Sequence, residues 1–134
     1  MAIPSGSGSE VLRNACVHNN NAATANIDFG GTTGTGTLRT SGNTAGVINV
    51  PANVIITVLN MTCTANSGNH NIYSIIDWQG SGTGATLFFH KDLLVDTTFV
   101  WNERIVLREG DELKVVNSAS HCTWTVNFIY QDWT

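Results

Sequence analysis

The sequence predicts an all-β protein with the architecture of an antiparallel β-sandwich. The last strand shows this most clearly, because Cys122, Trp124, Val126, Phe128 and Tyr130 alternate with other residues along one continuous run. Short runs of β-branched and aromatic residues recur along the chain, separated by turn-forming residues at the spacing typical of sandwiches. No segment carries a useful helical period, and 134 residues are enough for one domain with a core.

The composition indicates a globular protein with few charges. Apolar residues make up 42% of the chain and charged residues only 12%, about half the usual share of roughly 25%. Asn, Thr, Ser and Gly provide the polar surface instead, and a neutral surface suits a protein that packs against neighbours. A net charge of −4 with six Lys plus Arg argues against a nucleic-acid partner. The longest apolar-rich stretch, Val54–Met61, has the length of a strand, so we expect no membrane partner.

The first 46 residues differ from the rest, because hydrophobic residues are sparse there among Gly, Asn and Thr. Alone, such a stretch buries too little surface to offset the entropy lost on ordering. It is either a loosely draped tail or an extended N-terminal arm that becomes ordered against another subunit. The interspersed apolar residues favour the arm, since a pure linker would lack them. We therefore expect an arm over 1–46, a sandwich over 47–134, and intersubunit contacts by Val17, Ile27, Phe29 and Leu38.

The region from Val47 onward predicts a regular succession of strands and turns. Val50–Asn53 is a turn, and the strand after it is partly apolar on both faces, which indicates a central or covered strand. Gly110, between charged neighbours, predicts a hairpin turn. Strands are expected over residues 54–64, 71–79, 85–90, 99–102, 104–107, 113–116 and 122–130, with 99–107 forming one strand or two.

The three cysteines do not resemble the disulfide framework of a secreted protein, because their number is odd. Cys63 and Cys122 fall in expected strands, where buried free thiols are common. Cys16 lies in the N-terminal region. It would be free to pair between subunits if an assembly of this chain met oxidising conditions.

We expect no enzymatic activity, no catalytic residues, no metal site and no cofactor. His121 and Cys122 are neighbours in sequence and would point to opposite faces of a strand, so they do not chelate one ion easily. Asp77 next to Trp78 is a single acid, whereas a glycosidase needs two carboxyl groups about 5–9 Å apart. No Gly-x-Ser-x-Gly nucleophile motif is present. The remaining histidines, which we assign to turns and the surface, are His18, His70 and His90.

Two tryptophans, Trp78 and Trp101, are candidates for exposed aromatic contacts. Exposed aromatic rings on a sheet stack against sugars or anchor interfaces. Together with Tyr73, they would form the stacking platform of a carbohydrate-binding β-sandwich module. Partial burial at the ends of the sheets explains them equally well.

The stretch from Gly46 to Trp133 resembles a family of small β-sandwich virion proteins of tailed bacteriophages. VINVPANVIITVLNMTCTANSG resembles the opening of that family: a short strand, a turn, and a long strand ending in an Asn/Thr-rich turn. The C-terminal part of that family is resembled by two segments, HNIYSIIDWQG and the stretch from TLFFHKDLL to FIYQDW. The second segment contains an IVLREGDELKV hairpin before the last alternating strand. The resemblance implies a structural role on a virion and no catalytic residues to transfer. We expect the sandwich to be jelly-roll-like.

These expectations together describe a capsid decoration, or cement, protein. It would bind the assembled capsid and stabilise it by bridging subunits, with the major capsid protein and copies of itself, as a homotrimer, for partners. It would lie on the capsid exterior. The alternatives are a neck or tail accessory protein of the phage and the carbohydrate-binding module.

Overall fold

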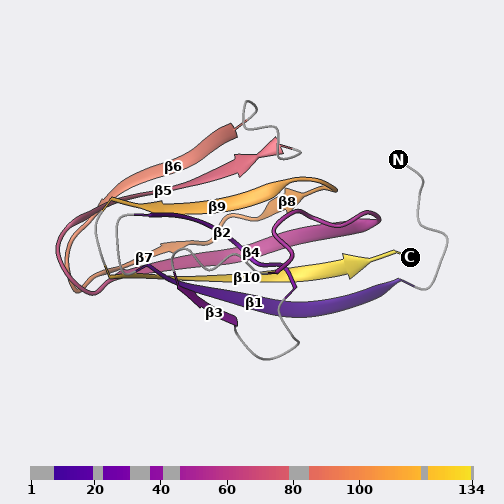
Figure 1. Ribbon diagram of the computed structural model, residues 1–134, viewed down its shortest axis with the longest axis horizontal. Helices are drawn as coiled ribbons and strands as arrows, with labels where there is room; N and C mark the ends of the chain where they lie inside the picture. Colours follow the sequence, from indigo (N-terminus) through magenta and orange to yellow (C-terminus); the bar gives the residue numbers. More distant parts are fainter. Residues whose placement is uncertain are drawn as a thin grey trace.

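The protein folds as a sandwich of two β-sheets. The computed structural model describes residues 8–19, 23–30, 37–40, 46–78, 85–118 and 121–133. The strands in these ranges form two sheets that stack face to face, one built around β10 and β4 and the other around β9 and β5 (Figure 1). The all-β sandwich expected from the sequence is therefore confirmed.

The larger sheet, sheet A, has six strands and the smaller, sheet B, has four. In spatial order, sheet A contains β3 (Thr37–Thr40), β1 (Ser9–Asn19), β10 (Cys122–Asp132) and β4 (Val54–Ala65), with β7 (Thr98–Trp101) and β8 (Ile105–Leu107) both pairing with β4. Sheet B contains β2 (Ala23–Asn26), β9 (Glu112–Asn117), β5 (His70–Asp77) and β6 (Ala85–Leu93).

The strand order is that of a jelly roll. Leaving out β3 and counting β7 and β8 as one interrupted strand gives eight strands, which we number one to eight along the chain. In sheet A the neighbouring strands are then the first, eighth, third and sixth. The order in sheet B is second, seventh, fourth, fifth. These are the two interleaved four-stranded sheets of an eight-stranded jelly roll. All pairings are antiparallel except that of β3, which adds to the edge of β1 in parallel.

The N-terminal region does not form a separate arm where the structure describes it. Strand β1 pairs with β10 along its whole length, from Ser9 opposite Asp132 to Asn19 opposite Cys122. Strand β2 pairs with β9 and so belongs to the other sheet. The first two strands of the jelly roll thus precede residue 47, and the sandwich extends across the boundary that the sequence suggested. Backbone pairing to the C-terminal strands supplies the order that the sparse apolar residues alone would not.

The core lies between the sheets and is made of aromatic and branched side chains. Trp124, Phe128 and Phe29 are its largest fully buried members. The rings of Phe29 and Phe128 meet edge to face, with centroids 5.5 Å apart and planes at 87°. This geometry is favourable for aromatic pairs. The alternation expected for the last strand is confirmed from Cys122 to Phe128, where buried and half-buried residues alternate, whereas Tyr130 is half-buried like its neighbours.

Residues with positive φ lie in the turns, and Asn and Gly are residue types that tolerate this conformation. Asn53 (φ 60°) ends the turn before β4, and Gly110 (φ 85°) occupies the turn between β8 and β9. Because β8 belongs to sheet A and β9 to sheet B, this turn carries the chain from one sheet to the other, and the hairpin expected there is wrong. The buried carboxylate of Asp28 accepts hydrogen bonds of 2.9 Å from the backbone N–H groups of Gly30 and Val47. Asp28 thereby fastens the segment leading to β4 against the end of β2.

Candidate functional site

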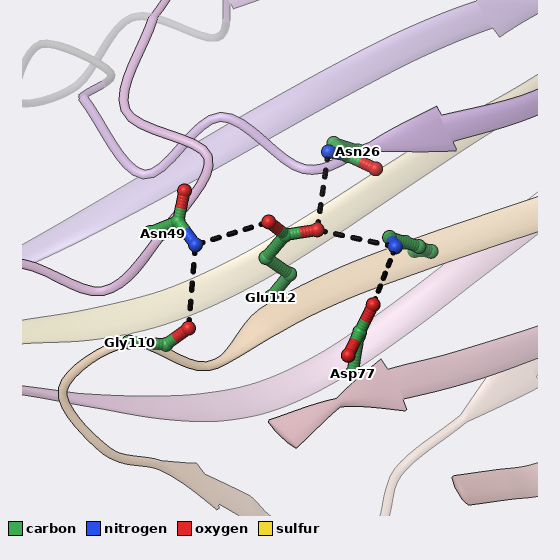
Figure 2. A network of polar contacts seen from close by, with 6 residues as sticks. Asn26, Asn49, Asp77, Gly110 and Glu112 are labelled. Atoms are coloured by element: carbon green, nitrogen blue, oxygen red, sulfur yellow. Dashed lines mark hydrogen bonds and ion pairs between the residues drawn. The ribbon is translucent and has the colours of Figure 1, made fainter. Parts of the chain in front are cut away.

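The most connected group of polar side chains lies on β9 and its neighbours in sheet B. Lys114 Nζ donates hydrogen bonds to Asp77 Oδ2 at 2.8 Å and pairs with Glu112 Oε2 at 3.2 Å. Asn49 Nδ2 donates to Glu112 Oε1 at 3.0 Å and to the carbonyl oxygen of Gly110 at 3.3 Å, as Figure 2 shows. Asn26 Nδ2 approaches the other oxygen of Glu112 at 3.5 Å.

This network is a structural brace rather than a reactive centre. The hydrogen bond to Asp77, with further support from Glu112, raises the pKa of Lys114 despite the opposing effect of burial. The amine therefore stays protonated and has no lone pair with which to act as a nucleophile or base. The buried Asp77 and half-buried Glu112 are both engaged with the ammonium group. The network joins β2, β5, β9 and the segment around Asn49.

The outer face of sheet A has a different character. Apart from Glu10 near the start of β1, which accepts a 3.0 Å hydrogen bond from Nε2 of Gln131 on β10, its outward side chains are uncharged across β1, β10, β4, β7 and β8, if histidine is counted as neutral. We call this surface the neutral face. Its members are Leu12, Asn14, Cys16 and His18 of β1, Thr123, Thr125, Asn127 and Ile129 of β10, Ile55, Thr57, Asn60, Thr62 and Thr64 of β4, Thr98 and Val100 of β7, and Val106 of β8.

The polar members of the neutral face bond to one another across the strands. Nδ1 of His18 lies 2.8 Å from Oγ1 of Thr123, and the hydroxyls of Thr64 and Thr98 lie 2.9 Å apart. Asn127 donates a 2.8 Å hydrogen bond from Nδ2 to Oδ1 of Asn60. Because these groups already have protein partners, covering the face would leave fewer polar atoms without a hydrogen bond than covering a face of unpaired polar groups.

The apolar members of the neutral face are most exposed at its two sides. Leu12 on β1 is 61% exposed, and Val106 on β8 and Val100 on β7 are 56% and 50% exposed. The order of the strands puts β1 on one side of the face and β7 and β8 on the other, with β10 and β4 between them. Such a surface can bind another protein by burying these side chains.

Sheet B presents several charges on its outer face, whereas Glu10 is the charged residue on the outward side of the strands that form the neutral face. Asp77, Glu112 and Lys114 occupy its outward positions on β5 and β9, and Asp92 lies opposite Asn71 on β6. The low overall charge of the protein is therefore unevenly distributed between its two faces. The neutral face is the better candidate for a binding surface, because fewer charges would lose water on contact.

The structure gives the expected arm contacts another role. Val17, Ile27 and Phe29 are buried in the core of their own chain, so their side chains are not exposed to another subunit. Leu38 lies in β3 opposite Cys16, and its side chain is outside the described part. The sequence analysis did not identify Leu12 as a candidate contact. Strand alternation could have indicated it, because Leu12 is an odd number of residues from the buried Ala15 and Val17 and so lies on the opposite face of β1.

The two candidate tryptophans are half-buried at the ends of strands. Trp101 stacks on Phe89 with ring centroids 5.3 Å apart and planes at 26°, and it packs against the core. Trp78 also packs against the core, with the guanidinium carbon of Arg108 5.8 Å from its ring centre. Tyr73 contacts His90 edge to face at 5.7 Å. These packings favour the explanation by partial burial and do not assemble one open stacking platform.

The remaining candidate chemistry is sparse in the part of the chain that the structure describes. Within it, no three His, Cys, Asp or Glu side chains are grouped so as to hold a metal ion. Nor does it contain a helix long and apolar enough to cross a membrane. Cys63 and Cys122 are buried free thiols, as expected, and Cys16 is half-buried on the neutral face.

Comparison with known proteins gives no relative. No protein-family model, curated protein or solved structure matches this chain. A function for the protein has to be argued from its own residues and geometry.

Proposed function

We propose that this protein is a virion structural protein, and specifically a capsid decoration protein that stabilises the assembled capsid by bridging its subunits. The neutral face carries the proposal, because it is a broad β-sheet surface built from uncharged residues, with exposed apolar side chains. The partners would be the major capsid protein and further copies of this chain. The protein would lie on the exterior of the capsid.

The jelly roll supports this function as a rigid scaffold. Eight-stranded double-sheet jelly rolls occur in viral capsid domains and also in lectins. Since one fold hosts many functions, the surface has to discriminate between these roles. The half-buried packing of Trp78 and Trp101 weakens the carbohydrate-binding alternative, which needs exposed aromatic faces.

The neutral face supports association between copies of the chain. Its exposed apolar residues lie on opposite sides, with Leu12 on β1 and Val106 on β8. A contact in which the β1 side of one copy meets the β8 side of the next joins two different patches. Such a contact generates a closed ring when the rotation between copies closes. We infer a ring of three, a homotrimer, which would bind at local three-fold positions of a capsid.

A trimer would also compensate for weak individual contacts to the capsid. Three copies held together engage the lattice at several points, and each further contact is effectively intramolecular. Because the protein would bind the assembled lattice and not free capsid subunits, it would shift the equilibrium toward the assembled state. This mechanism requires binding only and makes no use of catalysis.

The proposal is tested by adding the purified full chain to capsids that lack it. We expect the protein to co-sediment with the capsids over their whole surface and to raise the temperature at which they disassemble. Binding confined to the neck or tail would support the accessory alternative instead. A chain that binds glycans but not capsids would contradict the structural role.

A further inference from the structure

We propose that Cys63 and Cys122 are the site of a reversible disulfide bond that links the two central strands of sheet A. The bond would join β4 to β10 within one chain and would form whatever the protein binds. Both residues exist as free thiols in the structure.

The geometry brings the two sulfur atoms together inside the sandwich. Sγ of Cys63 lies 3.2 Å from Sγ of Cys122, and both side chains are fully buried. Cys63 is opposite Trp124 in the antiparallel register, so Cys122 is its diagonal neighbour on the same inward side. Bond formation needs the sulfurs to approach by about 1 Å further, to the roughly 2.05 Å of a disulfide. Strand pairing on either side of the cysteines holds the two sulfurs opposed.

The two thiols are not equivalent. The hydrogen bond from the Cys63 thiol lowers the pKa of Cys122, although burial acts in the opposite direction. The same hydrogen bond, with burial and the charge on Cys122, raises the pKa of Cys63. Cys122 is therefore the sulfur that ionises first, and a thiolate is the nucleophilic form of cysteine.

Hydrogen peroxide is an oxidant small enough to reach this site when the strand end opens. Cys122 begins β10, directly after His121, and the end is held by a hydrogen bond of 2.8 Å from Asn66 N to His121 O. Strand ends open locally at lower free energy than the whole fold. Transient opening at this end would admit peroxide to Cys122 without unfolding the sandwich.

The reaction balances in two steps. The Cys122 thiolate attacks one oxygen of hydrogen peroxide, the O–O bond breaks, and the departing hydroxide takes a proton, leaving a sulfenic acid and water. The Cys63 sulfur then attacks the sulfenic sulfur, the S–O bond breaks, and the hydroxide leaves as water with the Cys63 proton. Two thiols lose two electrons to one peroxide, and the products are one disulfide and two waters.

The experiment uses the full chain with Cys16→Ser, so that Cys63 and Cys122 are the only cysteines. The folded protein is treated with hydrogen peroxide, quenched, unfolded in guanidinium with N-ethylmaleimide, and digested with trypsin without reduction. Trypsin places the cysteines in the separate peptides 40–91 and 115–134. We expect these two peptides to be joined, the joined species to lack two hydrogen masses, and dithiothreitol to release them. Recovery of both peptides as alkylated thiols, or as separately oxidised acids, would overturn the proposal.

The unsubstituted protein provides the control for proximity. Its third cysteine lies in peptide 14–39, so oxidation of the unfolded chain would also join that peptide to the others. In the folded protein we expect the 40–91 to 115–134 link to predominate within a chain. A predominance of intrachain links to peptide 14–39 would contradict the assignment.

Discussion

Asn127 and Asn60 form a side-chain hydrogen bond of 2.8 Å across the centre of the neutral face, between β10 and β4. The register shifts between Asn127 and Phe128, so an extra residue of β4 is accommodated directly beside this pair. The two amides partly satisfy each other in the middle of the neutral face, whose members carry no charge. Burying them against another protein would cost less than burying two free amides. This pair therefore makes the middle of sheet A suited to contact.

Replacing Leu12 with Asp should weaken self-association of the protein by about tenfold or more, because it places an unpaired charge on the neutral face. Sedimentation equilibrium over a range of protein concentrations measures the effect. Leu94→Asp is the matched control, since Leu94 is also 61% exposed but lies outside the neutral face. Equal weakening by both variants would show that the effect comes from net charge and not from this surface.

Phe29→Ala should destabilise the folded chain by about 3–5 kcal/mol, because it removes a buried ring and leaves a cavity beside Phe128. Urea unfolding followed by tryptophan fluorescence measures the change. If Phe29 belonged to an arm that orders only on another subunit, the unfolding midpoint of the chain would stay unchanged.

Lys114→Met should lower the free energy of unfolding at pH 7 by about 1–3 kcal/mol, because Asp77 would lose its cation while remaining buried. Folding raises the pKa of Lys114, so its contribution is present below the ordinary lysine pKa of about 10.4 and is lost as pH rises through the folded value. The stability difference between wild type and Lys114→Met should therefore shrink at alkaline pH. Lys91→Met, at an exposed lysine, is the control. A difference that stays constant into the alkaline range would exclude the ionic contribution.

Gly46→Ala should destabilise the protein by about 1–3 kcal/mol or more. Gly46 has φ +121°, and an added Cβ would overlap the Asp28 carboxylate that organises this turn. Gly68→Ala is the control for backbone strain alone, because Gly68 has φ +74° and open space around its Cβ position. Thermal unfolding compares the two, and a larger loss for Gly68→Ala would refute the role given to the Asp28 turn.

The sequence predicted the strands with strong alternation and missed those without it. Strand β10 and the Gly110 turn were recognisable because each depends on local pattern. Strand β1 was not, because its inward positions include a small residue, Ala15, and a charged one, Arg13. The structure accommodates Arg13 through a 2.9 Å hydrogen bond to the carbonyl of Phe29 and a position 3.9 Å above the Tyr130 ring.

The candidate surface was harder to predict than the core. The low charge of the chain indicated a neutral surface, but not that the outer face of sheet A would carry fewer charges than that of sheet B. That separation depends on which strands pair, and β1 meets β10 only after more than a hundred residues. Trp101 is the opposite case: it was a candidate for an exposed aromatic ring, but Phe89 from the opposite sheet covers it. Long-range pairing decides exposure in both cases, and no local pattern encodes it.

The central claim is tested most directly by a cryo-electron microscopy map of capsids to which the purified protein has been added. The account predicts groups of three copies at local three-fold positions across the shell, with the neutral faces turned toward one another and away from solvent. Bare capsids, or copies attached singly with sheet A facing solvent, would contradict it.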